Sequence, residues 1–445
     1  MIEFLNGNAL HIPLVDRSVQ CIITSPPYWG LRDYGTAKWI GGDLNCEHRV
    51  GNQVQDNKAP SAIVSVVRPG TDTSQCVKCR AIRIDSQLGL ERIPDCLGWA
   101  RGENCGKCYV CHMRLVAMEC WRILRDDGVM WWNCGDSYMG GKGTSGAADP
   151  DTQAERYENG ETLTRPASQS TGGNGKLRPS DDLKTLRLSG LKPKDLVGIP
   201  WRVALAFQAD GWYLRMDNIW SKPNPMPESV ADRPTKSHEY VFLLSKSKRY
   251  YYDATAIMET LLSPPHAPGN KVIATGKTDR GHLENRIWGA ASGRNHRSVW
   301  EVATHPYRGA HFATFPEKLI EPMILSGSSP IACEVCRAPW ERDIERVAQY
   351  EKRQGRSQPS GVMPQVDSSG WNPAIVTDNG WTPTCNCSNN TGSGKCLVLD
   401  PFSGTATVGK VAIRHGRDFI GLELNLKYID LARERVGETQ TVMLE

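Results

Sequence analysis

The sequence has no long hydrophobic run, no N-terminal leader pattern and no strong excess of charge of either sign. No apolar stretch approaches the roughly 18 residues of a membrane-spanning helix, which excludes helical membrane proteins. The residues after Met1 lack the basic and apolar regions of a secretory signal, so we expect a cytoplasmic protein with no membrane partner. The formal net charge is only +4 over 445 residues, so the whole-chain balance neither indicates nor excludes a nucleic-acid partner.

Cysteine, by contrast, is abundant, with 15 residues. Disulfides are rare in the cytoplasm, and most of these cysteines lie in short pairs, which indicates metal binding. Three groups each offer four soft ligands for a tetrahedral structural zinc ion. They are Cys46, His48, Cys76 and Cys79; Cys96, Cys105, Cys108 and Cys111; and Cys333, Cys336, Cys385 and Cys387. The second group leaves alternatives open, because it could share ligands with His112 or with the first group, and its spacing also suits an iron–sulfur cluster.

A short apolar run, residues 19–24, ends at Ser25-Pro26-Pro27-Tyr28. Because proline has no N–H and a fixed φ, a buried parallel strand has to end here, and the carbonyls of Ser25 and Pro26 lose their strand partners. A hydroxyl, a carbonyl and an aromatic ring at the carboxyl end of a strand suit a planar base that carries an amino group. Upstream, residues 2–6 predict another strand, and we expect the two strands to form a parallel pair.

A second strand-and-turn pattern lies at residues 397–409, where an apolar strand ends at Asp400 and a glycine turn leads into a helix. This arrangement lets backbone N–H groups approach a ligand, although the absence of G-x-G-x-x-G spacing argues against a dinucleotide. The next strand ends at Glu423, and an acid about 20 residues on commonly bonds ribose hydroxyls in nucleotide-binding α/β folds. A helix is predicted from Leu426 to Val436.

These stretches resemble the motifs of the DNA amino-methyltransferases. Ser25-Pro26-Pro27-Tyr28 is similar to motif IV, the turn at 400–405 to motif I, and residues 311–319 to motif X. A strand, a proline-rich loop and a strand between residues 212 and 248 resemble motif VIII. The order, with motif IV first and motif I last, is similar to the β group of this family. The resemblance implies a Rossmann-like α/β methyltransferase fold that is circularly permuted and carries zinc-stapled insertions.

The resemblance also implies S-adenosyl-L-methionine as methyl donor and double-stranded DNA as partner. The catalytic residues it implies are Ser25, Pro26, Pro27 and Tyr28. Its cofactor-binding residues are Asn8, Thr314, Phe315, Asp400, Phe402, Ser403, Gly404, Thr405 and Glu423. For Asn8, a turn in which the side chain bonds its own backbone is an equally good interpretation. A cytoplasmic protein of a bacterium or phage, associated with the nucleoid through DNA, is expected.

Serine at the first motif IV position is, in this family, more often seen with methylation of cytosine N4 by base flipping, which we therefore expect. Methylation of adenine N6 is the alternative. A second alternative is a zinc-containing DNA-binding protein without catalysis, and a third is an RNA or protein methyltransferase. The absence of a Pro-Cys pair argues against a cysteine-based C5-cytosine mechanism. The recognition sequence, the oligomeric state and the existence of a restriction endonuclease partner stay open.

The expected domain organisation alternates motif-bearing segments with insertions. A basic segment, residues 271–310, holds seven Lys or Arg against three acidic residues and includes Trp288, Trp300 and Tyr307, which indicates target recognition or, alternatively, a solvated basic face. The predicted parts are 1–40 with the catalytic motif, 41–112 as a cysteine-rich insertion, 113–253 with a mobile loop at 139–190, 254–310 for target recognition, and 311–436 for the cofactor with a zinc-binding insertion at 331–396.

Overall fold

The computed structural model describes residues 1–30, 32–33, 36, 38–43, 45–48, 65–66, 75–76, 78–84, 87–91, 93–139, 190–192, 194–259, 294–304, 315–347 and 375–444. The chain forms two compact units. The first comprises Met1–Tyr250, Ser298–Ile324 and Leu397–Glu445, and the second Tyr251–Arg297 and Leu325–Cys396. Within the described ranges, no helix is both long and apolar enough to cross a membrane. Thr314, the loop at 140–189 and most of the basic segment lie outside the described residues.

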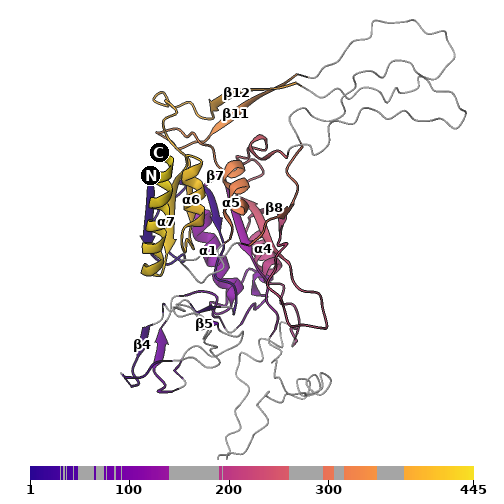
Figure 1. Ribbon diagram of the computed structural model, residues 1–445, viewed down its shortest axis with the longest axis vertical. Helices are drawn as coiled ribbons and strands as arrows, with labels where there is room; N and C mark the ends of the chain where they lie inside the picture. Colours follow the sequence, from indigo (N-terminus) through magenta and orange to yellow (C-terminus); the bar gives the residue numbers. More distant parts are fainter. Residues whose placement is uncertain are drawn as a thin grey trace, which may run out of the picture. The chain divides into compact units, whose positions relative to one another are not determined.

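The first unit is built around an eight-stranded mixed sheet, with the strand order β1-β14-β13-β2-β7-β9-β8-β10 (Figure 1). Neighbours from β1 to β7 are parallel, β9 runs antiparallel to both β7 and β8, and β10 is parallel to β8. The strands are β1 (Ile2–Asn6), β2 (Val19–Thr24), β7 (Leu124–Cys134), β8 (Tyr213–Ser221), β9 (His238–Ser245), β10 (Val299–Glu301), β13 (Leu397–Asp400) and β14 (Asp418–Glu423).

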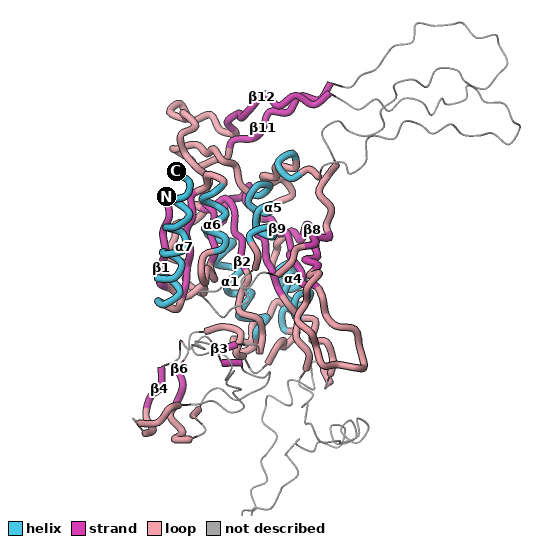
Figure 2. The backbone as a smooth tube through the Cα atoms, in the orientation of Figure 1, coloured by secondary structure: helices cyan, strands magenta, loops and turns pink. Residues whose placement is uncertain are grey.

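Helices cover both faces of this sheet because successive residues of its central strands point to opposite sides. Ile22 and Trp132 pack in one hydrophobic cluster with residues of α1 and α4, whereas Ile23 and Trp131 pack in the other with residues of α5, α6 and α7. Figure 2 shows the helices on the two sides of the strands. The helices are α1 (Tyr109–Ile123), α4 (Ile199–Ala209), α5 (Glu317–Gly327), α6 (Thr407–Arg414) and α7 (Leu426–Leu444), with short 3-10 turns η1 (Gly98–Arg101) and η2 (Thr255–Ile257).

The expected pairing of the first two strands is wrong. β1 and β2 share a sheet, but β14 and β13 lie between them. All six residues of β2 are buried, so this strand needs an apolar neighbour on each edge, and it finds them in β13 and β7. Trp300, one of the aromatics of the basic segment, is also placed differently from a surface residue: it is buried in β10 against Trp131, with ring centroids 5.9 Å apart.

The second unit contains an antiparallel pair, β11 (Trp340–Val347) and β12 (Ile375–Pro383). Arg342 of β11 forms an ion pair with Asp378 of β12 at 2.6 Å, which joins the two strands, and another with Asp253 at 3.0 Å, which ties the pair to a residue earlier in the sequence. Two small antiparallel pairs complete the described strands of the first unit. These are β3 (Arg32–Asp33) with β5 (Ser65–Val66), and β4 (Lys38–Ile40) with β6 (Ile82–Ile84).

Candidate active site

The carboxyl ends of the parallel strands bring motif residues from distant parts of the sequence to one edge of the sheet. Ser25 follows β2 directly, Asp400 ends β13 and Glu423 ends β14. In β7, which pairs with β2 up to Thr24, Asn133 lies one residue beyond the last paired position. Because a ligand of an open α/β sheet binds at this edge, the four side chains define a candidate site.

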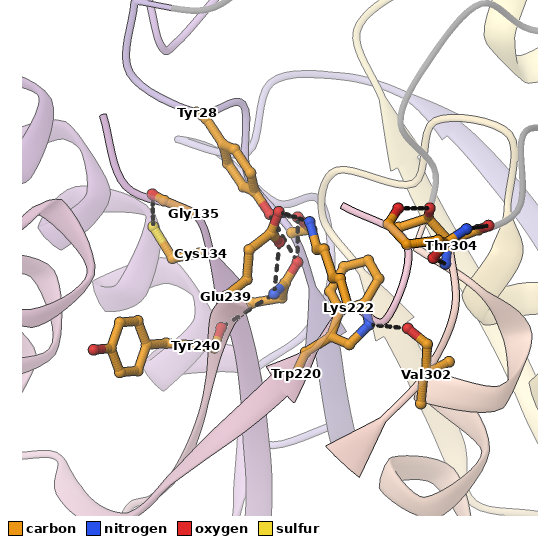
Figure 3. A network of polar contacts seen from close by, with 12 residues as sticks. Tyr28, Cys134, Gly135, Trp220, Lys222, Glu239, Tyr240, Val302 and Thr304 are labelled. Atoms are coloured by element: carbon orange, nitrogen blue, oxygen red, sulfur yellow. Dashed lines mark hydrogen bonds and ion pairs between the residues drawn. The ribbon is translucent and has the colours of Figure 1, made fainter. Parts of the chain in front are cut away.

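A polar network connects Ser25 with Tyr28, Glu239 and Lys222, and the last three are labelled in Figure 3. The Ser25 hydroxyl donates to Asn133 Oδ1 at 3.0 Å, and the Tyr28 hydroxyl lies 2.9 Å from the same oxygen and 2.5 Å from Glu239 Oε2. Lys222 of β8 forms an ion pair with the other oxygen of Glu239. The antiparallel strands β8 and β9 therefore bring a fixed pair of opposite charges to the catalytic motif.

The amide of Asn133 has a defined orientation in this network. Its Nδ2 donates to the Tyr240 carbonyl at 3.1 Å and to Glu239 Oε2 at 3.3 Å. Since both donors of the amide are engaged on the β9 side, Oδ1 faces the hydroxyls of Ser25 and Tyr28. The single proton of the Ser25 hydroxyl is therefore directed at Asn133, and its lone pairs are left to accept from an N–H group of a ligand.

Tyr28 is held as a neutral aromatic ring. Burial, with a further contribution from the charge of Glu239, raises the pKa of its hydroxyl well above the usual value. The ring also packs closely on Gly135, where an added Cβ would lie 2.5 Å from Tyr28 Cε2. Pro26 is buried, whereas Ser25, Pro27 and Tyr28 are half-buried and partly open to solvent.

Asp400 connects the strand of motif I with the strand of motif IV. Its Oδ1 accepts from Thr24 Oγ1 at 2.8 Å and from the Phe402 N–H at 3.0 Å. The residue is 1% exposed, and this burial raises the pKa of its carboxyl to about 7. Because Thr24 directly precedes Ser25, the bond fixes the spacing between the two motifs.

Glu423 is held by backbone donors at the end of β14. Its oxygens accept from the N–H groups of Gly404 at 2.9 Å and Asn425 at 2.8 Å. Burial raises the pKa of its carboxyl. Gly404 has a φ of +50°, in the left-handed region that favours glycine, and this conformation turns its N–H towards the acid.

Two other predicted cofactor residues use their side chains in hydrogen bonds within the protein, and a third is buried. Asn8 Oδ1 accepts from the Leu10 N–H at 3.0 Å, which is the bond expected for the turn interpretation, and its role towards a cofactor stays a prediction. Thr405 Oγ1 accepts from Arg435 at 3.0 Å. Ser403 is buried against Gly421, where no side chain larger than hydrogen fits. Phe315 and Phe402, the remaining described candidates, are half-buried and pack on the hydrophobic clusters.

The three predicted metal groups are each brought together, with all ligand atoms of a group within 4.8 Å of one another. Zinc–sulfur bonds of about 2.3 Å in a tetrahedron separate the sulfur atoms by about 3.8 Å. The observed Sγ–Sγ separations are 3.9 Å for Cys46 and Cys76 and 3.6 Å for Cys96 and Cys111. All 15 cysteines are free of disulfides, so these donors fit a tetrahedral metal ion. His112 is not a member of the second group, because its ring bonds Glu91 Oε1 at 2.7 Å.

The comparison with known families decides the class of the protein. The family model described as DNA methylase, N6_N4_Mtase, matches residues 19–333 and 387–434. The chain belongs to this DNA methylase family. The match confirms the expectation of an amino-methyltransferase of the N4-cytosine or N6-adenine class and of its α/β fold. It leaves the choice between cytosine and adenine unresolved, and a circular permutation of the fold stays a prediction.

Curated relatives of this DNA methylase are type II methyltransferases. The chain is 32% identical to M.Cfr9I of Citrobacter freundii, over 98% of the chain and 88% of the relative. It is 30% identical to M.SmaI of Serratia marcescens, over 94% and 83%. Among solved structures, the PvuII DNA methyltransferase (cytosine-N4-specific) is 14% identical with a TM-score of 0.42, over 98% of this chain and 90% of that one. A DNA modification methylase of Thermus thermophilus, described as putative and complexed with S-adenosyl-L-methionine, is 13% identical with a TM-score of 0.41, over 99% and 94%.

Sequence reasoning missed four members of the candidate site of this DNA methylase: Thr24, Asn133, Lys222 and Glu239. Asn133 carried a usable signal, because it is a polar residue near the end of an otherwise apolar strand. Lys222 and Glu239 lie in the stretch that resembles motif VIII, but no local pattern gave either of them a role in the site. They meet because β8 and β9 pair antiparallel with Ser221 opposite His238, a register that depends on the whole sheet.

Proposed function

We propose that this DNA methylase transfers a methyl group from S-adenosyl-L-methionine to the exocyclic N4 of cytosine in duplex DNA, with the target base flipped out of the helix. The observation that supports this most directly is the hydroxyl of Ser25, whose proton is engaged by Asn133 Oδ1. Flipping the base costs a few kcal/mol, and a neutral ring at Tyr28 offers a stacking surface that offsets part of this cost.

The chemistry requires that the amine nitrogen be made nucleophilic. The lone pair of an exocyclic amine is delocalised into the ring, so acceptors must hold its two N–H bonds out of the ring plane. Ser25 Oγ and the Pro26 carbonyl are the acceptors we propose, and they stabilise the developing positive charge on nitrogen. S-adenosyl-L-methionine, when bound, supplies an electrophilic sulfonium methyl group.

The pair of Lys222 and Glu239 keeps this acceptor set in place. Glu239 receives the Tyr28 hydroxyl and one Asn133 N–H, and Lys222 balances its charge. The matching of charges allows a carboxylate to stay close to the base without leaving a net negative charge beside it. We assign Lys222, Glu239 and Asn133 as positioning residues, because they act through Ser25 and Tyr28.

The proposed donor site lies where β13 and β2 meet. Glu423 is the partner we propose for the ribose hydroxyls, and the turn from Pro401 to Ala406 would supply backbone N–H groups. The bond from Thr24 to Asp400 is 2.8 Å long, and it holds the residues Ser25-Pro26-Pro27-Tyr28, which we call the base-binding loop, next to this turn. A methyl group held at the turn would therefore be close to the amine held by Ser25.

Mass spectrometry of DNA from an expressing host tests the choice of base. We expect N4-methylcytosine in the DNA of cells that express the wild type and less of it in cells that express Ser25→Ala. DNA that contains only N6-methyladenine would overturn the cytosine assignment and favour the alternative. If no methylated base forms and purified protein does not bind S-adenosyl-L-methionine, the catalytic proposal fails in favour of a DNA-binding protein without activity.

Target recognition is proposed for residues 254–310, which include the basic segment. Within the described part of that segment, Arg294 and Arg297 both pair with Glu259, at 2.8 and 3.0 Å, so a phosphate contact would have to compete with this carboxylate. Because the relatives are named type II methyltransferases, we also propose a cognate restriction endonuclease. Digestion with restriction endonucleases of host DNA from cells with and without the expressed protein would reveal the protected sequence.

A further inference from the structure

The second cysteine group is built into the start of helix α1. Cys108 is the residue that caps this helix, its sulfur accepts the Cys111 N–H at 3.4 Å, and Cys105 and Cys96 complete the group from the preceding loop. Further backbone N–H groups, those of Gly98 and Cys108, point at the sulfurs of Cys96 and Cys105 at 3.3 Å. Such N–H···S contacts stabilise thiolates, which is the form that a metal binds.

The residue that follows the cap reaches the catalytic motif. Tyr109 is fully buried, and its hydroxyl donates to the Pro27 carbonyl at 2.9 Å. It lies between two of the four metal ligands, Cys108 and Cys111. Its position on the first turn of α1 is therefore set by the group that a metal would clamp.

A second connection runs through Glu91. Its side chain bonds His112 of α1 at 2.7 Å, and its carbonyl accepts the indole N–H of Trp29 at 2.7 Å. The other carboxylate oxygen accepts from the Gly89 N–H, and Gly89 in turn accepts the Gly30 N–H at 2.7 Å. Pro27, Trp29 and Gly30 are thus each held by α1 or by the segment next to it.

The loop before α1 that carries Cys96 and Cys105 is itself fixed to the rest of the first unit. Asp95, fully buried, pairs with Arg202 of α4 at 2.9 Å, and Arg114 of α1 pairs with Asp210 at the end of α4 at 2.5 Å. Because these ion pairs hold one side of the loop in place, a metal ion that fixes the cysteines would also fix the position of the Ser25-Pro26-Pro27-Tyr28 motif.

We propose that a tetrahedral metal ion, zinc by the chemistry of its four thiolates, binds Cys96, Cys105, Cys108 and Cys111 and positions the base-binding loop through Tyr109 and Glu91. The inference rests on the proposed methyl-transfer function, and it assigns this group a role beyond stapling an insertion. Without the ion, four thiols within 4.8 Å of one another lose their common partner, the first turn of α1 loosens, and the Pro27 carbonyl loses its donor.

Two variants separate the metal from its effect. Cys105→Ser changes the exposed ligand and should lose one equivalent of metal from the full-length protein, measured by elemental analysis. Tyr109→Phe keeps the metal and removes only the hydroxyl that reaches Pro27. Tyr213→Phe, which removes a hydroxyl from an exposed position on β8, is the matched control. Thermal unfolding confirms that each variant is folded.

We expect Tyr109→Phe to lower the single-turnover rate of tritiated methyl transfer to unmethylated DNA about three- to tenfold, the effect of losing a buried hydroxyl that bonds the Pro27 carbonyl and also contacts the Cys134 side chain. Cys105→Ser should lower it further, and Tyr213→Phe should leave it unchanged. Affinity for S-adenosyl-L-methionine should stay the same in all three variants, because Glu423 and its turn are untouched.

Hydrogen exchange of the peptide that contains Gly30 provides a readout independent of activity. Its N–H is bonded to Gly89, and we expect it to exchange at least about tenfold faster in Cys105→Ser than in the wild type. Absence of metal from the wild type at this group, or wild-type exchange and transfer rates in a Cys105→Ser protein that has lost its metal, would overturn the inference. If instead the wild type transfers no methyl group, the proposed function fails while the exchange experiment still decides the coupling.

Discussion

Replacement of Asp400 by asparagine should make the protein less sensitive to alkaline pH. The carboxyl of Asp400 is 1% exposed, and burial is the main reason that its pKa rises to about 7, with the nearby charge of Glu423 adding to the shift. An asparagine keeps Oδ1 as the acceptor for Thr24 and Phe402 and carries no charge at any pH. The variant therefore imitates the protonated form of the wild type.

The direction in which stability changes with pH follows from the direction of the Asp400 pKa shift. In the unfolded chain an aspartate ionises near about pH 3.9, so between that value and about 7 the folded protein holds a proton that the unfolded chain has released. Stability from this group is thus fully present below the unfolded pKa and is lost as the pH rises to about 7. A shift of about three pH units corresponds to about 4 kcal/mol, of which about 3 kcal/mol falls between pH 5 and pH 8.

Urea unfolding of the first unit at pH 5, 6, 7 and 8 measures this effect. We expect the free energy of unfolding of Asp400→Asn, relative to that of the wild type, to rise by up to about 3 kcal/mol over this range. Asp430→Asn, at a position whose side chain is 77% exposed, controls for the loss of a carboxylate and should show no such trend. If the difference in the free energy of unfolding between Asp400→Asn and the wild type did not change with pH, the protonated state of Asp400 would be refuted.

Three further predictions concern the motif, the cofactor and the metal. Ser25→Ala should lower the single-turnover rate while cofactor affinity and stability stay within error. Tyr28→Ala removes stacking worth about 1–3 kcal/mol, so it should also weaken DNA capture. Equal single-turnover rates for Ser25→Ala and the wild type would place the chemistry elsewhere. Glu423→Ala should weaken binding of S-adenosyl-L-methionine by calorimetry, by about 1.5–3 kcal/mol if the acid pairs with the ribose, and an unchanged affinity would remove it from the site. Cys336→Ser should lose one metal equivalent and increase proteolysis within residues 331–396, and elemental analysis that finds no metal in the wild type would contradict this expectation.

Local patterns were sufficient to predict the strands that are short and strongly apolar, such as those at residues 19–24 and 397–400, whereas β10 was not predicted. The strand that ends at Glu423 and the helix after it are observed at Asp418–Glu423 and Leu426–Leu444. Adjacency of strands was not predictable in the same way. The insertion of β13 and β14 between β1 and β2 depends on contacts between residues that are far apart in the sequence, and nothing within residues 2–24 specifies it.

The candidate site was likewise predictable only in part. The positions of Ser25, Asp400 and Glu423 follow from strand ends, which sequence patterns mark with proline, glycine and polar residues. The side-chain partners of these residues do not follow. Asn133 and Glu239 reach Ser25 and Tyr28 only through the registers of β7 with β2 and with β9, and a shift of one residue would turn both side chains to the opposite face.

The bond between Thr24 and Asp400 joins residues that are 376 positions apart, and this distance has a consequence for synthesis in the cell. At about 5–20 residues per second, the ribosome needs roughly 20–75 s to travel from one to the other. During that time β7 can pair with one edge of β2, but the other edge, which finally receives β13, has no partner. We expect nascent chains to depend on chaperones that cover this apolar edge, and the yield of folded enzyme to rise when translation or growth temperature is lowered.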